Sequence, residues 1–301
     1  MRFDRTSRML LMAETMLFSS MCFGAGTFHV DHGFRGESPT GASWLSAFPT
    51  LQGAIDAAAD AGGGEVWVKA GVHKPEGGSR NATIELKPGV ELYGGFRGFE
   101  TERDQRNPKA NRTVLSGDIG RSGSPDNCYH VLTGASNARI DGFIISRGNA
   151  NAAGVNRFGG GLILPAGSQN TTVANCTFEK NHAESGGGIH AQDATFAATN
   201  CTFYSNSAQA GGAVALARGA RLGAVDCIFS SNFAPIAGGA VFLPTDSNAT
   251  FTRSTFLYTS TDGSGGAIHA ETDKEAGLGL ELHHSTFREN SAELNGGALA
   301  L

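Results

Sequence analysis

The sequence predicts an all-β fold, a right-handed parallel β-helix with a short capping helix near its N-terminus. Three observations lead to this prediction. A phenylalanine returns at intervals of 25 to 31 residues, a Gly-Gly block returns in the same register, and the repeat contains no helical pattern. An internal period of this kind identifies a repeat architecture before local propensities are considered.

The repeat carries two motifs that keep their order over five copies. The phenylalanines are Phe178, Phe203, Phe229, Phe256 and Phe287. An asparagine follows the phenylalanine by three residues, except that Thr259 takes its place in the fourth copy. The glycine block reads GGGI, GGAV, GGAV, GGAI and GGAL, starting at residues 186, 211, 238, 265 and 296. Leucine-rich repeats need leucines at fixed positions, and propeller blades need about 40 residues or more, so the parallel β-helix remains.

The local pattern indicates which side chains face the interior. In NCTFYSN, Cys201 and Phe203 alternate with Thr202, which predicts that Cys and Phe point inward and Thr outward. We expect Asn and Gly at the turns, because both tolerate the left-handed backbone conformation. Coils about 4.8 Å apart then stack like residues on like residues. Cys176, Cys201 and Cys227 are interpreted as small buried side chains, since stacked residues point the same way and do not suit a disulfide.

One segment before the repeats has a helical pattern. PTLQGAIDAAADAGGG predicts an amphipathic helix over about residues 50–61, with Thr50 as N-cap and three glycines closing it. The apolar face consists of Leu51, Ala54, Ile55, Ala58 and Ala59. We expect this helix to cover the open end of the solenoid. Residues 97–111, RGFETERDQRNPKAN, are charged and broken by proline, which predicts a solvated loop that leaves the coil.

Composition and charge limit the domain organisation and the partners. The chain has 301 residues with 43 glycines and 17% charged residues, which suits one solenoid domain over 27–301 with regular coils from about 130 to 301. A net charge of −5 without a basic stripe argues against nucleic acid as a partner. No apolar run reaches the length of about 18 residues that predicts a transmembrane helix.

The two ends of the chain carry expectations of their own. Residues 1–26 have the basic, apolar, small order of a signal peptide, interrupted by Glu14, and the alternatives are a disordered leader or an incorrectly placed start. The chain stops on GGALAL, inside an expected strand. Either more chain follows and this is a truncated end, or the open coil self-associates with another copy.

The repeat motifs resemble those of the bacterial polymorphic outer-membrane proteins. The resemblance rests on the Gly-Gly-Ala-(Ile/Leu/Val) blocks Gly211–Val214, Gly238–Val241, Gly265–Ile268 and Gly296–Leu299, and on the Phe-x-x-Asn pairs. It covers about residues 40–301. It implies a pectate-lyase-like solenoid that is exported and is either secreted or displayed on the outer membrane at the cell surface. It implies little about activity, because this fold carries lyases, epimerases, hydrolases, tailspikes and adhesins.

One column of the repeat contains candidate catalytic residues. The residues just before each Cys or Ser are Asn175, Asn200, Asp226, Arg253 and His284. Asp226, Arg253 and His284 place an acid, a cation and a base on adjacent coils, an arrangement that a polysaccharide lyase or hydrolase can use. The alternative is a column of turn residues, which the two asparagines favour.

The sequence predicts no metal site and no cofactor. His190 and His269 occupy the same outward position three coils apart, at about 14 Å, which is too far to share a metal ion. Asp118, Asp126 and Asp141 are spread along the early coils without the clustering that Ca²⁺ needs.

Two functional interpretations remain. The first is a non-catalytic secreted or surface protein that acts in adhesion, display or glycan contact, with glycans or cell-surface components as partners. The second is a carbohydrate-active enzyme, a polysaccharide lyase, epimerase or hydrolase, on the same scaffold. The outward positions of the regular coils are mostly occupied by residues that do not ionise, which favours the first interpretation. These residues are Thr177, Thr202, Ile228, Thr255, Thr286, Ala215 and Phe242.

Overall fold

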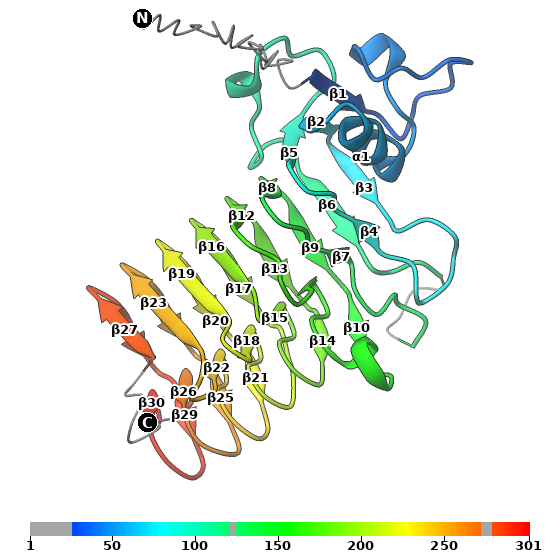
Figure 1. The fold of residues 1–301 in the computed structure, drawn as a ribbon. Coiled ribbons are helices and arrows are strands. Elements are labelled where there is room, and N and C mark those ends of the chain that lie inside the picture. Colours follow the sequence, from blue (N-terminus) through cyan, green and yellow to red (C-terminus); the bar gives the residue numbers. More distant parts are fainter. Residues whose placement is uncertain (1–25, 121–124, 272–278) are drawn as a thin grey trace, which may run out of the picture.

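The computed structural model describes residues 26–120, 125–271 and 279–301, so almost all of the predicted signal peptide lies outside the described residues. Within them the chain winds into a right-handed parallel β-helix of about eight turns (Figure 1). Three long sheets run the length of the solenoid, and every strand pairs in parallel with its equivalent on the neighbouring coil. The predicted fold class is confirmed.

The three long sheets are named A, B and C here, in the order in which each coil visits them. Sheet A has nine strands: β1 (Gly26–Val30), β2 (Gly64–Lys69), β5 (Val90–Phe96), β8 (Arg139–Asp141), β12 (Thr171–Ala174), β16 (Thr195–Thr199), β19 (Arg221–Val225), β23 (Asn248–Thr252) and β27 (Leu280–His283). Sheet B has eight: β3 (Gly71–His73), β6 (Thr113–Ser116), β9 (Ile144–Ser146), β13 (Thr177–Glu179), β17 (Thr202–Tyr204), β20 (Ile228–Ser230), β24 (Thr255–Leu257) and β28 (Thr286–Arg288).

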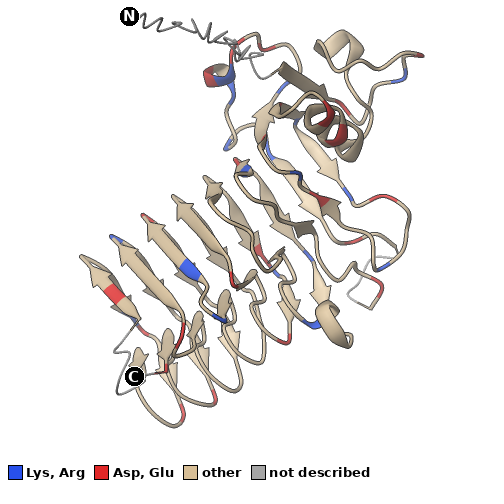
Figure 2. Cartoon of the chain, viewed as in Figure 1, with Lys and Arg blue, Asp and Glu red and all other residues tan. Residues whose placement is uncertain are grey.

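Sheet C has eight strands: β4 (Ile84–Glu85), β7 (Leu132–Thr133), β11 (Leu162–Leu164), β15 (Ile189–Gln192), β18 (Val214–Ala217), β22 (Val241–Leu243), β26 (Ile268–Ala270) and β30 (Leu299–Ala300). From β11 onward, each of these strands begins at the end of a glycine block. Short ladders occupy the corner between B and C. They are β10 (Asn149–Ala150) with β14 (His182–Ala183), and β21 (Phe233–Ala234), β25 (Ser260–Thr261) and β29 (Ser291–Ala292). Charged residues are sparse on the strands of the regular coils (Figure 2).

The phenylalanines form the predicted interior ladder. Phe178, Phe203, Phe229 and Phe256 are fully buried and face each other in register across sheet B. Successive rings are nearly parallel, with centroids 5.1, 4.8 and 4.6 Å apart. The stack continues to Phe287, 4.7 Å away. This column and the aliphatic side chains of the three sheets fill a single continuous core.

The asparagines after the phenylalanines do not take the turn conformation that was expected of them. The left-handed residue is the one before, such as Lys180 (φ 55°) and Ser205 (φ 53°). Asn181, Asn206 and Asn232 are instead buried, each with at most 1% of its surface exposed. Their side chains bond to the neighbouring coils, and this use explains why asparagine recurs there. The expectation was therefore wrong for these three asparagines, because it considered backbone strain and not the side-chain amide, whereas Asn175 and Asn200 do take the left-handed conformation.

The glycine blocks do mark a turn. Gly211 has φ 63°, a left-handed conformation that favours glycine. Gly212 is needed for a different reason, since a Cβ atom there would lie 2.3 Å from the carbonyl oxygen of Gly239 on the next coil. The two glycines thus allow the coil to turn and the coils to approach each other.

Helix α1 (Leu51–Asp60) forms where the pattern predicts it. The Thr50 side chain accepts a hydrogen bond from the Gly53 N–H at 3.2 Å, as an N-cap does. Leu51, Ala54, Ile55 and Ala58 are buried against the same core as the coils. Figure 1 shows α1 lying across the end of the solenoid near β1 to β5. Three short 3₁₀ helices complete the described elements: η1 (Trp44–Ser46), η2 (Arg103–Gln105) and η3 (Gly154–Arg157).

The buried cysteines behave as predicted. Cys128, Cys176, Cys201 and Cys227 are buried and form no disulfide with one another. The Cys176 thiol donates to the carbonyl oxygen of Ala174 at 3.1 Å, and burial raises its pKa to about 12. Among the described residues no helix is long and apolar enough to cross a membrane.

Candidate binding groove

The charged loop predicted at residues 97–111, called loop 97–112 below because Arg112 lies at its end, has most of its residues exposed, as expected, but it is also anchored to the solenoid. Arg106 from this loop donates to Asp141 on β8, with Nη2 2.6 Å from Oδ1. Its Nη1 also donates to the carbonyl oxygen of Gly94 at 3.0 Å. The side chain of Arg106 is only 14% exposed and that of Asp141 only 3%. The loop is therefore fixed by a buried ion pair to two coils.

Asp141 is the centre of this anchor. Its second oxygen accepts from Arg139 at 2.6 Å, and the Asn175 amide donates to Oδ1 at 2.8 Å. Burial by itself would raise the pKa of Asp141, but the hydrogen bonds from Arg106, Asn175 and Arg139 hold it below its usual value. Asp141 is thus an ionised carboxylate at neutral pH, matched by two guanidinium groups.

The start of the loop is held by a second carboxylate. Glu100 is 4% exposed and accepts hydrogen bonds from the backbone N–H groups of Arg97, Gly98 and Phe99, at 2.7, 3.0 and 3.1 Å. Burial opposes ionisation of Glu100, but these backbone donors outweigh it and lower its pKa. The carbonyl oxygen of Glu100 also accepts from Trp44 Nε1 at 2.9 Å. Both anchors are internal to the structure, which leaves the far end of the loop free to present its own side chains.

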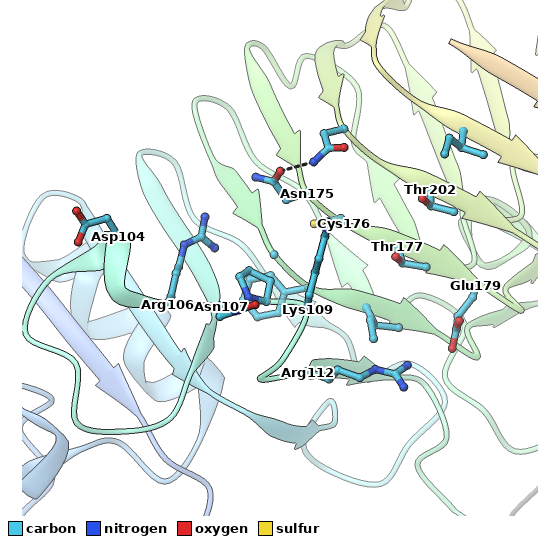
Figure 3. A pocket seen from close by; sticks show the side chains of 16 residues that line it. Asp104, Arg106, Asn107, Lys109, Arg112, Asn175, Cys176, Thr177, Glu179 and Thr202 are labelled. Atoms are coloured by element: carbon cyan, nitrogen blue, oxygen red, sulfur yellow. Dashed lines mark hydrogen bonds between the residues drawn. The ribbon is translucent and has the colours of Figure 1, made fainter. Parts of the chain in front are cut away.

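The docked loop and the outer face of sheet B enclose a groove of about 900 Å³ (Figure 3). One wall is the loop, from Asp104 to Arg112. The floor is the outward column of sheet B, in register from coil to coil. Its residues are Ile144, Thr177, Thr202 and Ile228. Asn175, Asn200 and Glu179 add amide and carboxylate groups to the floor.

Four charged side chains of the groove have no charged or hydrogen-bonding partner among the described residues. Lys109 and Arg112 on the loop are exposed, and so is Asp104, whereas Glu179 on β13 is half-buried. Over the described ranges, none of the four forms an ion pair or a side-chain hydrogen bond. This differs from Arg106, which lines the same groove but is committed to Asp141. The groove therefore offers two cations, two carboxylates and a row of hydroxyl and amide groups to a ligand.

The column of predicted catalytic residues lies at the turns between sheets A and B. Asp226, Arg253 and His284 have φ values of 55°, 49° and 52°, and Asn175 and Asn200 share this left-handed conformation. This backbone conformation is the one expected if the column consists of turn residues. Arg253 donates to both carboxylate oxygens of Asp226 at 2.8 Å, and these hydrogen bonds lower the pKa of Asp226.

The structure thus brings together two of the three candidates. Asp226 and Arg253 neutralise each other at the surface, and none of the three residues lines the groove. A catalytic role for Asp226, Arg253 and His284 stays a prediction. The residues that sequence reasoning missed are Lys109, Arg112 and Glu179, because only the docking of the loop brings them together.

No metal centre is evident in the described parts of the chain, where no three His, Cys, Asp or Glu side chains come together as metal ligands do. His190 and His269 occupy one column of sheet C, separated by Ala215 and Phe242. The expected three-coil separation is confirmed. His190 is, however, buried beneath Phe158.

The comparison with family models agrees with the fold. A family model described as a right handed beta helix region matches residues 126–256. The crystal structure of Escherichia coli YbhC is 14% identical, with a TM-score of 0.49 over 94% of this chain and 75% of that one. The Azotobacter vinelandii mannuronan C-5 epimerase AlgE4 A-module is 12% identical, with a TM-score of 0.25 over 91% of this chain and 97% of that one. No curated protein matches. With TM-scores below 0.5, these two structures support no conclusion about this chain.

Proposed function

We propose that the chain is a non-catalytic β-helix protein that binds an acidic polysaccharide segment in the groove between loop 97–112 and sheet B. The observation that carries this proposal is the pair Lys109 and Arg112, two cations without a partner in the described structure, on a loop that a buried ion pair fixes in place. Lysine and arginine side chains bind carboxylates through charge-assisted hydrogen bonds.

The rest of the groove supports an extended sugar ligand. Its volume of about 900 Å³ lies within the usual range of ligand sites. Two adjacent coils each place one threonine hydroxyl and one asparagine amide on the floor, Thr177 with Asn175 and Thr202 with Asn200, and these groups offer polar contacts to a chain of hydroxylated residues. Glu179 can accept hydrogen bonds from sugar hydroxyls.

The test is a binding titration of the full chain with oligogalacturonate and oligomannuronate, and with a neutral glucan as comparison. We expect the dissociation constant for an acidic oligosaccharide to rise at least tenfold in the double variant Lys109→Ala/Arg112→Ala. Loss of both cations should remove at least about 1.4 kcal/mol of binding free energy, which corresponds to a tenfold change in the dissociation constant. Arg221→Ala is the matched control, since Arg221 is an exposed arginine on β19, outside the groove. Equal affinity of the double variant and the control would overturn the proposal.

A second candidate function is a carbohydrate-active enzyme that uses the same groove. Asp104 and Glu179 are two groove carboxylates without an ion-pair partner in the described structure, and glycoside hydrolases use two carboxylates. Depolymerisation of the bound oligosaccharide that disappears in Glu179→Gln would favour this candidate. Binding without any change in oligosaccharide length favours the non-catalytic function.

We also propose that the protein acts outside the cytoplasm, secreted or at the outer-membrane surface, in adhesion or display. This proposal is supported by the resemblance of its repeats to those of polymorphic outer-membrane proteins. Fractionation of native cells with an antibody against the chain tests it. Recovery in the medium or loss of signal after protease treatment of intact cells is the expected result, and recovery in the cytosolic fraction alone would contradict it.

A further inference from the structure

A histidine on the outer face of sheet C is buried without a hydrogen-bond partner among the described residues. His190 on β15 is 4% exposed, and the ring of Phe158 lies nearly parallel to it with centroids 4.5 Å apart. Neither Nδ1 nor Nε2 of His190 has a hydrogen-bond partner in the described part of the chain. A neutral imidazole carries one donor and one acceptor, and leaving both buried and unmet is unfavourable. Such a group in a folded protein calls for an explanation.

His190 lines a pocket of about 460 Å³ that is separate from the groove. Its lining includes three rings, those of Phe158, His190 and Phe242. It also includes the polar side chains of Gln192, Arg218 and Asp246. The pocket shares no lining residue with the groove between loop 97–112 and sheet B.

The polar side chains of this pocket form no ion pair within the described structure. Arg218 and Asp246 are exposed at the rim and form no ion pair with each other or with any other described residue. Asp246 accepts a weak hydrogen bond of 3.3 Å from the Ser247 hydroxyl. Burial lowers the pKa of His190 to about 4, with a smaller contribution from His130, so the ring is neutral at pH 7. The pocket thus combines a cation, an anion, an amide and a neutral imidazole around an aromatic wall.

We propose that this second pocket binds a single acidic sugar, a hexuronate. Arg218 pairs with its carboxylate, Asp246 and Gln192 bond its hydroxyls, and Phe242 contacts the apolar face of the ring. His190 supplies a donor and an acceptor to the ligand once the Phe158 ring moves aside. An aromatic wall with a few convergent polar groups is the usual composition of a small-molecule site, and a unit with both a carboxylate and hydroxyls satisfies each of the groups present.

The experiment is a titration of the full chain with free galacturonate and glucuronate, followed by the ¹H–¹⁵N spectrum of the histidine rings, with glucose as the uncharged comparison. We expect saturable shifts of the His190 ring nitrogens with the uronates and none with glucose. Arg218→Ala should raise the dissociation constant about tenfold or more, because a hydrogen bond to a charged group contributes enough for that change. His190→Phe keeps a ring beneath Phe158 and should weaken binding as well.

Two controls make the test specific to this pocket. The double variant Lys109→Ala/Arg112→Ala should leave these shifts unchanged, which separates the pocket from the groove, so either site can fail without the other. If His190→Phe does not fold, Arg218→Ala still decides, since Arg218 is exposed and outside the core. Unshifted His190 signals at saturating uronate, or equal affinity of Arg218→Ala and the unsubstituted protein, would overturn the proposal.

Discussion

The asparagine three residues after an interior phenylalanine, replaced by Thr259 in one coil, links its coil to both neighbours, as Asn206 does to Asn181 and Asn232. The Asn206 amide nitrogen donates to the carbonyl oxygen of Phe178 at 2.8 Å. Its oxygen accepts from the backbone N–H and the side-chain amide of Asn181, both at 3.1 Å. Asn232 repeats the arrangement one coil later, with its amide 2.9 Å from the carbonyl oxygen of Phe203. Each ladder asparagine satisfies buried groups that have no access to water.

Asn206→Ala should therefore be costly. It leaves the Phe178 carbonyl and the Asn181 donors buried with a partner missing, and we expect the free energy of unfolding to fall by about 3 kcal/mol. Thr259→Ala is the matched control at the same position of a later coil. The Thr259 hydroxyl makes one such bond, to Asn290 Oδ1 at 2.7 Å, so the expected loss there is about 1 kcal/mol. Urea unfolding followed by circular dichroism measures both, and equal losses would contradict this account.

At this scale the sequence predicts the interior better than the corners. Phe203 and Cys201 are identified as buried by simple alternation, because each strand has one side toward the core. The left-handed residues Lys180, Ser205 and Tyr258 have no common chemistry, so no sequence signal marks them. The role of Asn206 depends on partners 25 or more residues away, which only the stacking of coils brings within bonding distance.

Loop 97–112 is the element that makes the groove, and its anchor depends on charge. Asp141 on β8 accepts hydrogen bonds from Arg106 of the loop, from Arg139 on the same strand and from Asn175 in the turn after β12. Through Asp141 the loop is joined to β8 and to that turn. The sequence shows a charged segment broken by proline, and such a segment is usually solvated. The loop is anchored here because Arg106 pairs with the carboxylate of Asp141, which lies 35 residues further along the chain. Pairing at that separation cannot be read from local composition.

Asp141→Asn tests this anchor and its pH dependence. At pH 7 we expect a loss of about 3 kcal/mol in the free energy of unfolding, since removing one partner leaves Arg106 with an uncompensated buried charge. The pKa of Asp141 in the native protein lies below its ordinary value of 3.8, so the ionised form favours folding. Its contribution is complete above pH 3.8 and disappears as the pH falls through the lower native value.

The difference in the free energy of unfolding between Asp141→Asn and the unsubstituted protein should accordingly become smaller below about pH 4. Asp118→Asn is the control, because Asp118 pairs with Arg147 at 3.3 Å in a more exposed position and should cost under about 1 kcal/mol. Thermal unfolding between pH 2.5 and pH 7 measures both variants. A difference for Asp141→Asn that is constant over this range would show that the anchor does not depend on ionisation.

The whole molecule is a row of coils, and each coil contacts its neighbours. Paired strands, stacked phenylalanines and the asparagine ladder all join adjacent coils in register. In such a solenoid, the free energy of unfolding is approximately the sum of the intrinsic stabilities of the coils and the free energies of the interfaces between neighbouring coils. The period in the sequence predicts this architecture because every copy repeats the same interior positions. The two candidate ligand sites arise from what departs from the period, loop 97–112 in one case and Phe158 with the corner at Arg218 and Asp246 in the other.

A nearest-neighbour molecule should lose stability locally. The Phe229 ring is fully buried between Phe203 at 4.8 Å and Phe256 at 4.6 Å, with Phe251 at 5.7 Å beside it. We expect Phe229→Ala to cost about 4 kcal/mol through the lost contacts and the cavity. Hydrogen exchange by mass spectrometry should then show lost protection in β17, β20 and β24, while α1 at the distant end stays protected.

Phe287→Ala provides the comparison within the same column. Phe287 is only half-buried and, in the described structure, stacks on Phe256 alone. Its removal opens one interface instead of two, so the expected cost is lower and the loss of protection should stay in β24 and β28. If Phe229→Ala instead removes protection uniformly from α1 to β28, the coils unfold as one cooperative unit, and the nearest-neighbour description of this solenoid fails.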